Sequence, residues 1–170
     1  MAVFITAIIV SKGVGMTEKY IKWFEDEELS IEFSEVPHVC IRYILPSASE
    51  LEKKSIKKYP FINKTNLEVR LYDKEKEEIY DFSILKGECF NGADIPRFFW
   101  RLIGAQTDNT FLIPSMIHDK LCNEHNLVNN DRHFSSLVFR AMLIAGGVSK
   151  FKAQTMYLAV DNFQRFCNWN

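Results

Sequence analysis

The sequence predicts an α+β fold, with an N-terminal, mainly antiparallel sheet and short helices followed by a C-terminal cluster of three helices. Two observations predict it. Alternating or β-branched apolar segments are concentrated before residue 90, whereas apolar residues from Pro114 onward recur at helical spacing. Strands first and helices second is typical of α+β rather than of an alternating, doubly wound fold. The chain has 170 residues, the length of one domain.

Residues 1–30 are expected to contain a strand and a short helix. The nine-residue apolar run Ala2–Val10 is typical of a buried strand, and the Ser-Lys-Gly after it is typical of a turn. Tyr20, Trp23 and Phe24 then recur at the i, i+3, i+4 spacing of a helical face. Thr17 is placed to cap that helix.

A second strand and a lysine-rich helix are expected next. The segment His38–Leu45 is apolar and β-branched, and Pro46 closes it. Ser47 followed three residues later by Glu50 is a capping-box pattern, which predicts a helix that Pro60 ends. The helix carries a lysine stripe typical of a solvated face: Lys53, Lys54, Lys57 and Lys58.

A β-hairpin is expected in the middle of the chain. Leu67–Tyr72 and Ile79–Leu85 are strand-like segments on either side of the charged turn at residues 73–78. In the first of them, apolar and charged residues alternate, as in a strand with one buried face. A short third strand is expected over Lys86–Phe90.

Three helices are expected in the C-terminal half. Pro114 suits a first helical turn, so the first helix should run from there to about Leu127. Gly146 is placed to end the second helix, and Ser149 to cap the third. The second helix is predicted by an apolar stripe at i, i+3, i+4, i+7, i+8 spacing: Phe134, Leu137, Val138, Ala141 and Met142.

Charge, hydropathy and cysteine usage exclude several classes of protein. Lys and Arg number 21 and Asp and Glu 22, a net charge of −1, so we expect no nucleic-acid partner. The longest apolar run has nine residues, against roughly 20 for a membrane span, so we expect none. The cysteines form no C-x-x-C pair, which favours reduced thiols in a cytosolic compartment: Cys40, Cys89, Cys122 and Cys167.

The most unusual segment is the polar turn that follows the expected third strand. Asn91-Gly92 is a turn dipeptide, and Asp94 can accept backbone N–H bonds ahead of Pro96. Aromatic residues follow at once, so the turn is expected to lie against the core. An Asn and an Asp beside an apolar wall form a candidate pocket, although such a turn is also a common structural element.

His118 and Asp119 are the second group of candidate residues. On a helix His118, Cys122 and His125 fall at i, i+4, i+7, which is one face. Imidazole and thiolate groups are zinc ligands, so these three residues are a candidate zinc site. Cys122 is equally well explained as a small core residue, and the sequence leaves both interpretations open.

We expect the imidazole of His118 to reach the turn before Pro96 and to join the helical half of the chain to the sheet. In a hydrolase, Asp119 or Asp94 would orient His118, which would act as a base or a metal ligand. A buried His–Asp pair that only ties the helix to the turn is the alternative. Whether the protein is an enzyme stays open at this point.

The order and spacing of these motifs resemble family 1353 of domains of unknown function, found in tailed phages, prophages and plasmids. The family has an aspartate–glycine–alanine–serine–isoleucine–proline turn, a tryptophan, a helical histidine–aspartate pair, an arginine, a second-helix aspartate and a methionine–tyrosine helix. The resemblance covers roughly residues 67–163. The matching positions here are Gly92–Trp100, His118, Asp119, Arg132 and Met156-Tyr157.

The chain departs from the family pattern at three positions. Asn91 replaces the first aspartate of the turn, Asp94 stands where serine is usual, and Ser136 aligns with the second-helix aspartate. The resemblance implies a polar pocket, which assigns candidate catalytic roles to His118, Asp119, Asp94, Asn91 and Arg132.

These observations predict a phage-type accessory protein that acts by protein–protein contact, most simply as a virion, tail or assembly component without catalysis. Its partners would be phage structural proteins or a host protein, and its location the host cytoplasm and the virion. The alternatives are a metal-dependent hydrolase and an inhibitor of a host defence protein. We expect one domain, residues 1–170, in which residues 1–66 are an N-terminal extension specific to this chain and residues 67–170 are the family-like hairpin and helical core.

Overall fold

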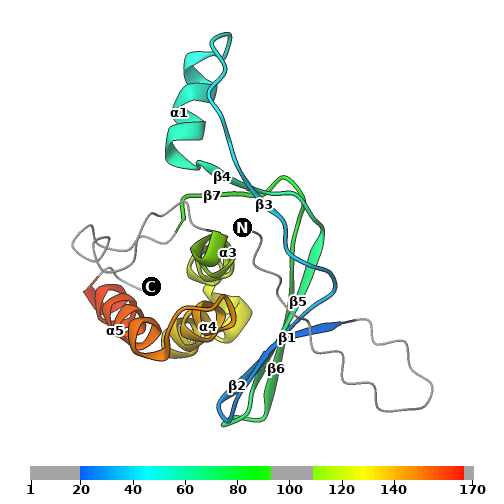
Figure 1. Ribbon diagram of the computed structural model, residues 1–170, viewed down its shortest axis with the longest axis vertical. Helices are drawn as coiled ribbons and strands as arrows, with labels where there is room; N and C mark the ends of the chain where they lie inside the picture. The colour runs from blue at the N-terminus through cyan, green and yellow to red at the C-terminus, as the bar shows by residue number, and fades with distance from the viewer. Residues whose placement is uncertain (1–19, 93–108, 167–170) are drawn as a thin grey trace.

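The computed structural model describes residues 20–92 and 109–166 (Figure 1). This part of the chain contains two antiparallel sheets, three long helices and two shorter helices. The sheets are formed by the N-terminal half and the long helices by the C-terminal half, so the predicted α+β class is confirmed. The expected strand Ala2–Val10, Thr17 and Asp94 lie outside the described residues.

The large sheet has four strands in the order β1-β2-β5-β6, all antiparallel. Side chains of β5 alternate strictly between buried and half-buried positions, because successive residues of a strand point to opposite faces. The predicted hairpin is confirmed as β5 and β6. The strand bounds are β1 Ile21–Glu25, β2 Leu29–Phe33, β5 Leu67–Asp73 and β6 Glu78–Ile84.

The prediction of a helix that begins near Thr17 is wrong, because residues 21–25 form the edge strand β1. A bulge shifts the register between Lys22 and Phe24. A bulge places an extra residue on one strand, so Trp23 and Phe24, although adjacent, both pack against the core. Trp23 lies 5.3 Å from Phe33 between ring centroids. The bulge therefore produced an apolar spacing that resembles a helix.

The small sheet has three short strands in the order β3-β4-β7. Its strands are β3 Val39–Ile41, β4 Phe61–Asn63 and β7 Cys89–Phe90. The expected third strand is thus present as the two-residue strand β7, which pairs with β4. The buried amide of Asn63 donates hydrogen bonds to the carbonyl groups of Ile84 and Leu85, at 3.2 and 3.1 Å, and so ties the small sheet to the end of β6.

Between β3 and β4 the chain leaves the sheet and forms a projection, residues 42–59, which we call the arm. Its helix α1, Glu50–Lys58, points away from the large sheet and from the other helices (Figure 1). The predicted capping box is present, but it is formed by Ser49 and Glu52 instead of Ser47 and Glu50. Residues 47 and 48 belong to a turn closed by the Ala48 N–H, which donates to the Leu45 carbonyl at 3.0 Å.

The C-terminal half forms the helices α3, α4 and α5 and the single-turn helix η1. α3 begins at Asn109, before Pro114, and ends at Asn123 instead of about Leu127. Burial of Phe111 and Leu112 outweighs the one helical hydrogen bond that Pro114 cannot donate. Gly146 and Ser149 end α4 and begin α5 as predicted. The bounds are α3 Asn109–Asn123, η1 His125–Val128, α4 Arg132–Ala145 and α5 Lys150–Phe166.

The helices cover one face of the large sheet (Figure 1). Two apolar clusters form there, one between the sheet and the helices and one among the helices. In the larger cluster, the inward residues of β2, β5 and β6 pack against α3 and α4. In the smaller one, Phe139 and Leu143 of α4 pack against Met156 and Val160 of α5. α3 and α4 therefore lie between the sheet and α5. Within residues 20–92 and 109–166, no helix has the length and hydropathy needed to cross a membrane.

Gly92 closes the turn after β7 with φ +83°, and an added Cβ would lie 2.8 Å from the Phe61 ring. Gly87 also has a positive φ, +98°, but nothing lies within 4 Å of its Cβ position. Gly92→Ala should therefore lower the free energy of unfolding by about 2 kcal/mol, and Gly87→Ala by about 1 kcal/mol. Urea denaturation of both variants measures the free energy of unfolding. Equal losses of stability would show that the Phe61 ring moves away from the added Cβ at little cost.

Candidate functional site

The central helix α3 carries the predicted His-Asp pair in the interior. His118 is 6% exposed and Asp119 is 8% exposed. Side chains on almost every face of α3 are buried, as expected for a helix enclosed by a sheet and by other helices. The pair is therefore buried inside the fold instead of lying on an open surface.

His118 lies against Cys122 of the same helix and Phe139 of α4. Its Nε2 and Nδ1 atoms are 3.5 and 3.6 Å from the Cys122 Sγ, and its ring centroid is 5.0 Å from that of Phe139. Burial lowers the pKa of His118 to about 4, because the imidazolium form loses its hydration. The ring is thus neutral at pH 7 and is a weak base, which does not favour proton abstraction from a thiol or a water molecule.

The three residues of the predicted zinc site do not share one helical face. α3 ends at Asn123, and His125 begins η1, so the i, i+7 relation to His118 is broken. Cys122 and His118 are in contact, but no three His, Cys, Asp or Glu side chains in the described ranges are grouped as metal ligands. The structure thus brings His118 and Cys122 together, and a zinc site that also includes His125 stays a prediction.

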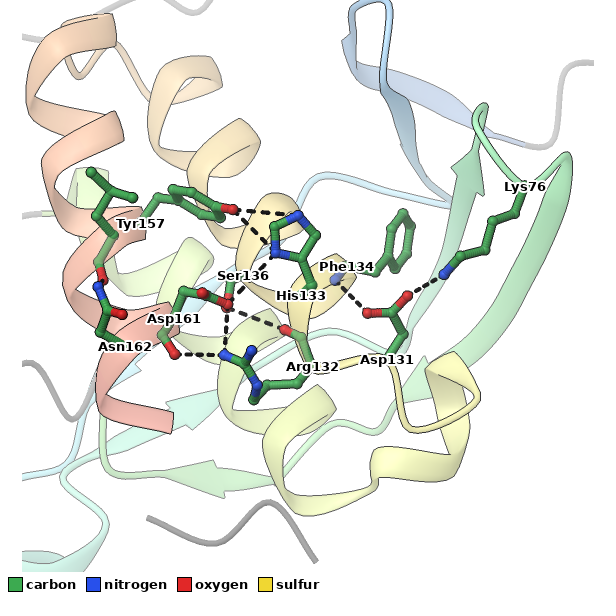
Figure 2. Close-up of polar contacts among 10 residues, drawn as sticks. Lys76, Asp131, Arg132, His133, Phe134, Ser136, Tyr157, Asp161 and Asn162 are labelled. Atoms are coloured by element: carbon green, nitrogen blue, oxygen red, sulfur yellow. Dashed lines mark hydrogen bonds and ion pairs between the residues drawn. The ribbon is translucent and has the colours of Figure 1, made fainter. Parts of the chain in front are cut away.

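Arg132 joins the start of α4 to α5 (Figure 2). Its Nη1 donates to the backbone carbonyl of Asp161 at 2.5 Å and to Oδ1 of the same residue at 2.6 Å. The Asp161 side chain is 7% exposed and the Arg132 side chain 20%. This ion pair is largely removed from solvent, and it fixes the packing of the two helices.

His133 lies on the solvent side of the same ion pair. Its Nδ1 is 3.2 Å from the Tyr157 hydroxyl and 3.7 Å from Asp161 Oδ1 (Figure 2). The second distance exceeds hydrogen-bond length, and Arg132 already occupies that oxygen. Burial and the Asp161 charge raise the pKa of Tyr157. The geometry differs from a catalytic His–Asp dyad and corresponds to a polar clamp between helices.

One face of α4 links the two polar groups. Arg132, Ser136 and Phe139 follow at i, i+4, i+7, and Phe139 contacts His118. His118 and Arg132 therefore meet the same face about two turns apart, roughly 10 Å along the axis. Ser136 lies between them, fully buried, and its hydroxyl donates to the Arg132 carbonyl at 3.2 Å.

The polar turn before Pro96 is described only in part. Asn91 is half-buried directly after β7, and Gly92 is buried. Asp94 lies outside the described residues, so the contact between His118 and the turn stays a prediction.

The sequence predicted no site role for Asp161 or His133, and Tyr157 was noted only as a position that matches the family pattern. Tyr157 and Asp161 are spaced i, i+4 on α5, and this face also carries buried apolar residues. A buried carboxylate inside an apolar stripe requires a cationic partner, which was the available signal for a pairing with an arginine on another helix.

His118 should make stability depend on pH. The unfolded chain takes up a proton near pH 6.5 and the folded chain only near pH 4, so stability falls as pH decreases between these values. The loss should reach about 3 kcal/mol, and His118→Gln should abolish that part of it. Urea unfolding at pH 7.0, 5.5 and 4.5 measures it. The exposed His133→Gln is the control, and equal pH slopes for both variants would refute the assignment.

Removal of Arg132 should leave a buried carboxylate without its cation. Arg132→Met should lower the free energy of unfolding by about 2–3 kcal/mol. The matched control is Arg70→Met, because the Arg70–Asp81 pair has the same chemistry but side chains 37% and 52% exposed. Arg70→Met should lower the free energy of unfolding by at most about 1 kcal/mol. Similar losses in urea denaturation would mean that the Asp161 carboxylate is effectively hydrated.

Comparison with known proteins gives one family match and one curated relative. Residues 66–160 match the family described as "Protein of unknown function (DUF1353)". The protein y4jT of Sinorhizobium fredii (strain NBRC 101917 / NGR234), described as an uncharacterized protein, is 35% identical over 77 residues. The match covers 45% of this chain and 22% of y4jT, so the chain spans about a fifth of that relative. No solved structure matches the chain.

The matched residues include β5, β6, β7, α3 and α4 and most of α5, whereas the arm precedes them. Because the match covers more than half of its length, the chain belongs to the DUF1353 family.

Proposed function

We propose that the protein is a phage-type accessory protein that acts by contact with another protein, and that the arm forms the contact. A single observation carries the proposal. No residue of the arm is buried, yet the arm carries four large exposed apolar side chains. Exposed apolar clusters of this kind are typical of interaction surfaces. Their exposed fractions are 78% for Tyr43, 43% for Ile44, 62% for Leu45 and 81% for Leu51.

The arm is ordered by its own polar contacts, independently of an apolar core. The Ser49 N–H donates to Glu52 at 2.7 Å in the capping box, and the Arg42 guanidinium donates to the Tyr59 carbonyl at 2.9 Å. A preformed surface binds with less loss of conformational entropy than a disordered one. The arm is therefore suited to presenting its apolar side chains to a partner.

The family resemblance supports a place for the protein in a virion, a tail or the assembly pathway, since related proteins occur in tailed phages and prophages. The protein would then act in the host cytoplasm during infection and enter the particle. An inhibitor of a host defence protein is the alternative that would use the same arm. A hydrolase is less well supported, because the pKa of His118, lowered to about 4, does not suit a base at neutral pH.

The proposal predicts that the arm can be altered without loss of folding but with loss of partner contact. The triple variant Tyr43→Ser, Leu45→Ser, Leu51→Ser should keep the free energy of unfolding within about 1 kcal/mol, because the replaced side chains are exposed. Mass spectrometry of purified particles should detect the wild-type chain and find the triple variant reduced at least tenfold.

The matched control is Ile79→Ser with Leu158→Ser, which are 60% and 49% exposed on β6 and α5. The control should enter particles as the wild type does. Equal incorporation of the triple variant would overturn the role of the arm. A wild-type chain absent from particles, but cross-linked through the arm to a host protein in infected cells, would favour the inhibitor.

A further inference from the structure

We infer that the arm recognises an acidic segment of its protein partner, with one bulky apolar side chain of that segment seated in a pocket of the arm. The inference rests on the proposed function and specifies the chemistry of the partner. It is carried by the charge of the arm, by the pocket and by the position of lysines on α1.

The arm is a basic projection on an otherwise acidic protein. Residues 42–59 contain five basic and two acidic side chains, a net charge of +3, whereas the whole chain has −1. The remainder of the chain therefore carries −4. Complementary charge steers association and selects partners, so an arm of this sign favours a negatively charged surface.

The pocket has a volume of about 190 Å³ and lies within the arm itself. Liquid water occupies about 30 Å³ per molecule, so the volume corresponds to about six waters, or one large side chain. Apolar side chains border the pocket together with Arg42, Ser47 and Glu52, so that an apolar anchor would lie beside polar groups. The Glu52 carboxylate already accepts hydrogen bonds from the Ser49 N–H and hydroxyl in the capping box. The lining residues include Arg42, Tyr43, Leu45, Ala48, Glu52 and Ile56.

The lysines follow the pocket along α1. Glu52 and Ile56 are spaced i, i+4 and line the pocket, and Lys53 and Lys57 form the adjacent row on the helix. Lys57 is exposed, and Lys53 forms an exposed ion pair with Glu50 at 2.8 Å. Such surface pairs are weak and can exchange partners. A segment anchored in the pocket can therefore extend along this row with its carboxylates near the ammonium groups.

A protein segment fits the arm better than a membrane or a nucleic acid. A bilayer surface is flat and offers no protruding side chain to fill the pocket. A nucleic acid is long enough to reach beyond the arm and would then meet the −4 charge of the remaining chain, whereas a short peptide can stay on the arm. An acidic peptide with one apolar anchor satisfies both the pocket and the charge.

The test uses the full chain and a displayed library of random twelve-residue peptides. Selection on the wild-type chain should enrich sequences in which Asp and Glu flank one Trp, Phe or Leu. The best peptide, synthesised with a fluorescent label, should bind about tenfold more weakly to Ile56→Gln, since burial of one apolar side chain is lost. Lys53→Gln with Lys57→Gln should weaken it about fivefold, and added salt should have a similar effect.

Two variants serve as matched controls for composition and fold. Leu158→Gln replaces an exposed apolar residue on α5, and Lys86→Gln with Lys150→Gln removes two exposed lysines outside the arm. Both should bind the peptide within twofold of the wild type. All substitutions in helices use glutamine because its helix propensity is close to that of leucine and lysine, and circular dichroism confirms folding.

Enrichment of neutral or basic peptides, or no enrichment, would overturn the inference. The inference would also be wrong if Ile56→Gln bound the peptide as tightly as the wild type. It would likewise be wrong if the wild type bound phosphatidylserine vesicles or duplex DNA and the Lys53→Gln, Lys57→Gln variant did not. None of these results decides whether the protein acts through the arm, because particle incorporation of the Tyr43, Leu45, Leu51 variant tests that separately.

Discussion

The burial of α3 is the constraint on which the rest of the structure depends. One side of this helix packs against the inward face of the large sheet, and α4 and α5 enclose the other. Polar residues on such a helix must be neutral or paired. On α3, burial holds His118 neutral, and between α4 and α5 the Arg132–Asp161 pair balances its own charge. Two residues that resembled parts of a reaction centre, His118 and Arg132, are therefore accommodated in the packing of three helices on one sheet.

Elements with an uninterrupted period were predictable from sequence, and interrupted ones were not. The β5–β6 hairpin and α4 follow periods of 2 and 3.6 throughout, and their bounds were close to those observed. β1 was missed because its bulge brings two adjacent aromatic residues to the core. The start of α3 was misplaced because Pro114 suggested a first turn, whereas burial of upstream residues extends the helix through it.

The candidate site was predictable only where its geometry is local. The contact between His118 and Cys122 follows from their i, i+4 spacing on one helix. The end of α3 at Asn123, which removes His125 from that face, depends on the packing of η1 and had no clear local signal. The Arg132–Asp161 pair joins residues 29 positions apart, so it arises from the tertiary arrangement of α4 and α5.

The arm is inserted between paired neighbours. Ile41 and Phe61 face each other across β3 and β4, and the Arg42 N–H donates to the Pro60 carbonyl at 2.7 Å, so the two ends of the insertion are already closed. The entropic cost of closing such a loop rises slowly with the length of the loop. No side chain of the arm is buried, so the sequence of the arm does not affect the packing of the core. The arm can thus become longer or shorter, or be replaced, while the sheets and the other helices keep their structure. The residues proposed for recognition and the residues that stabilise the fold can therefore change independently in this chain.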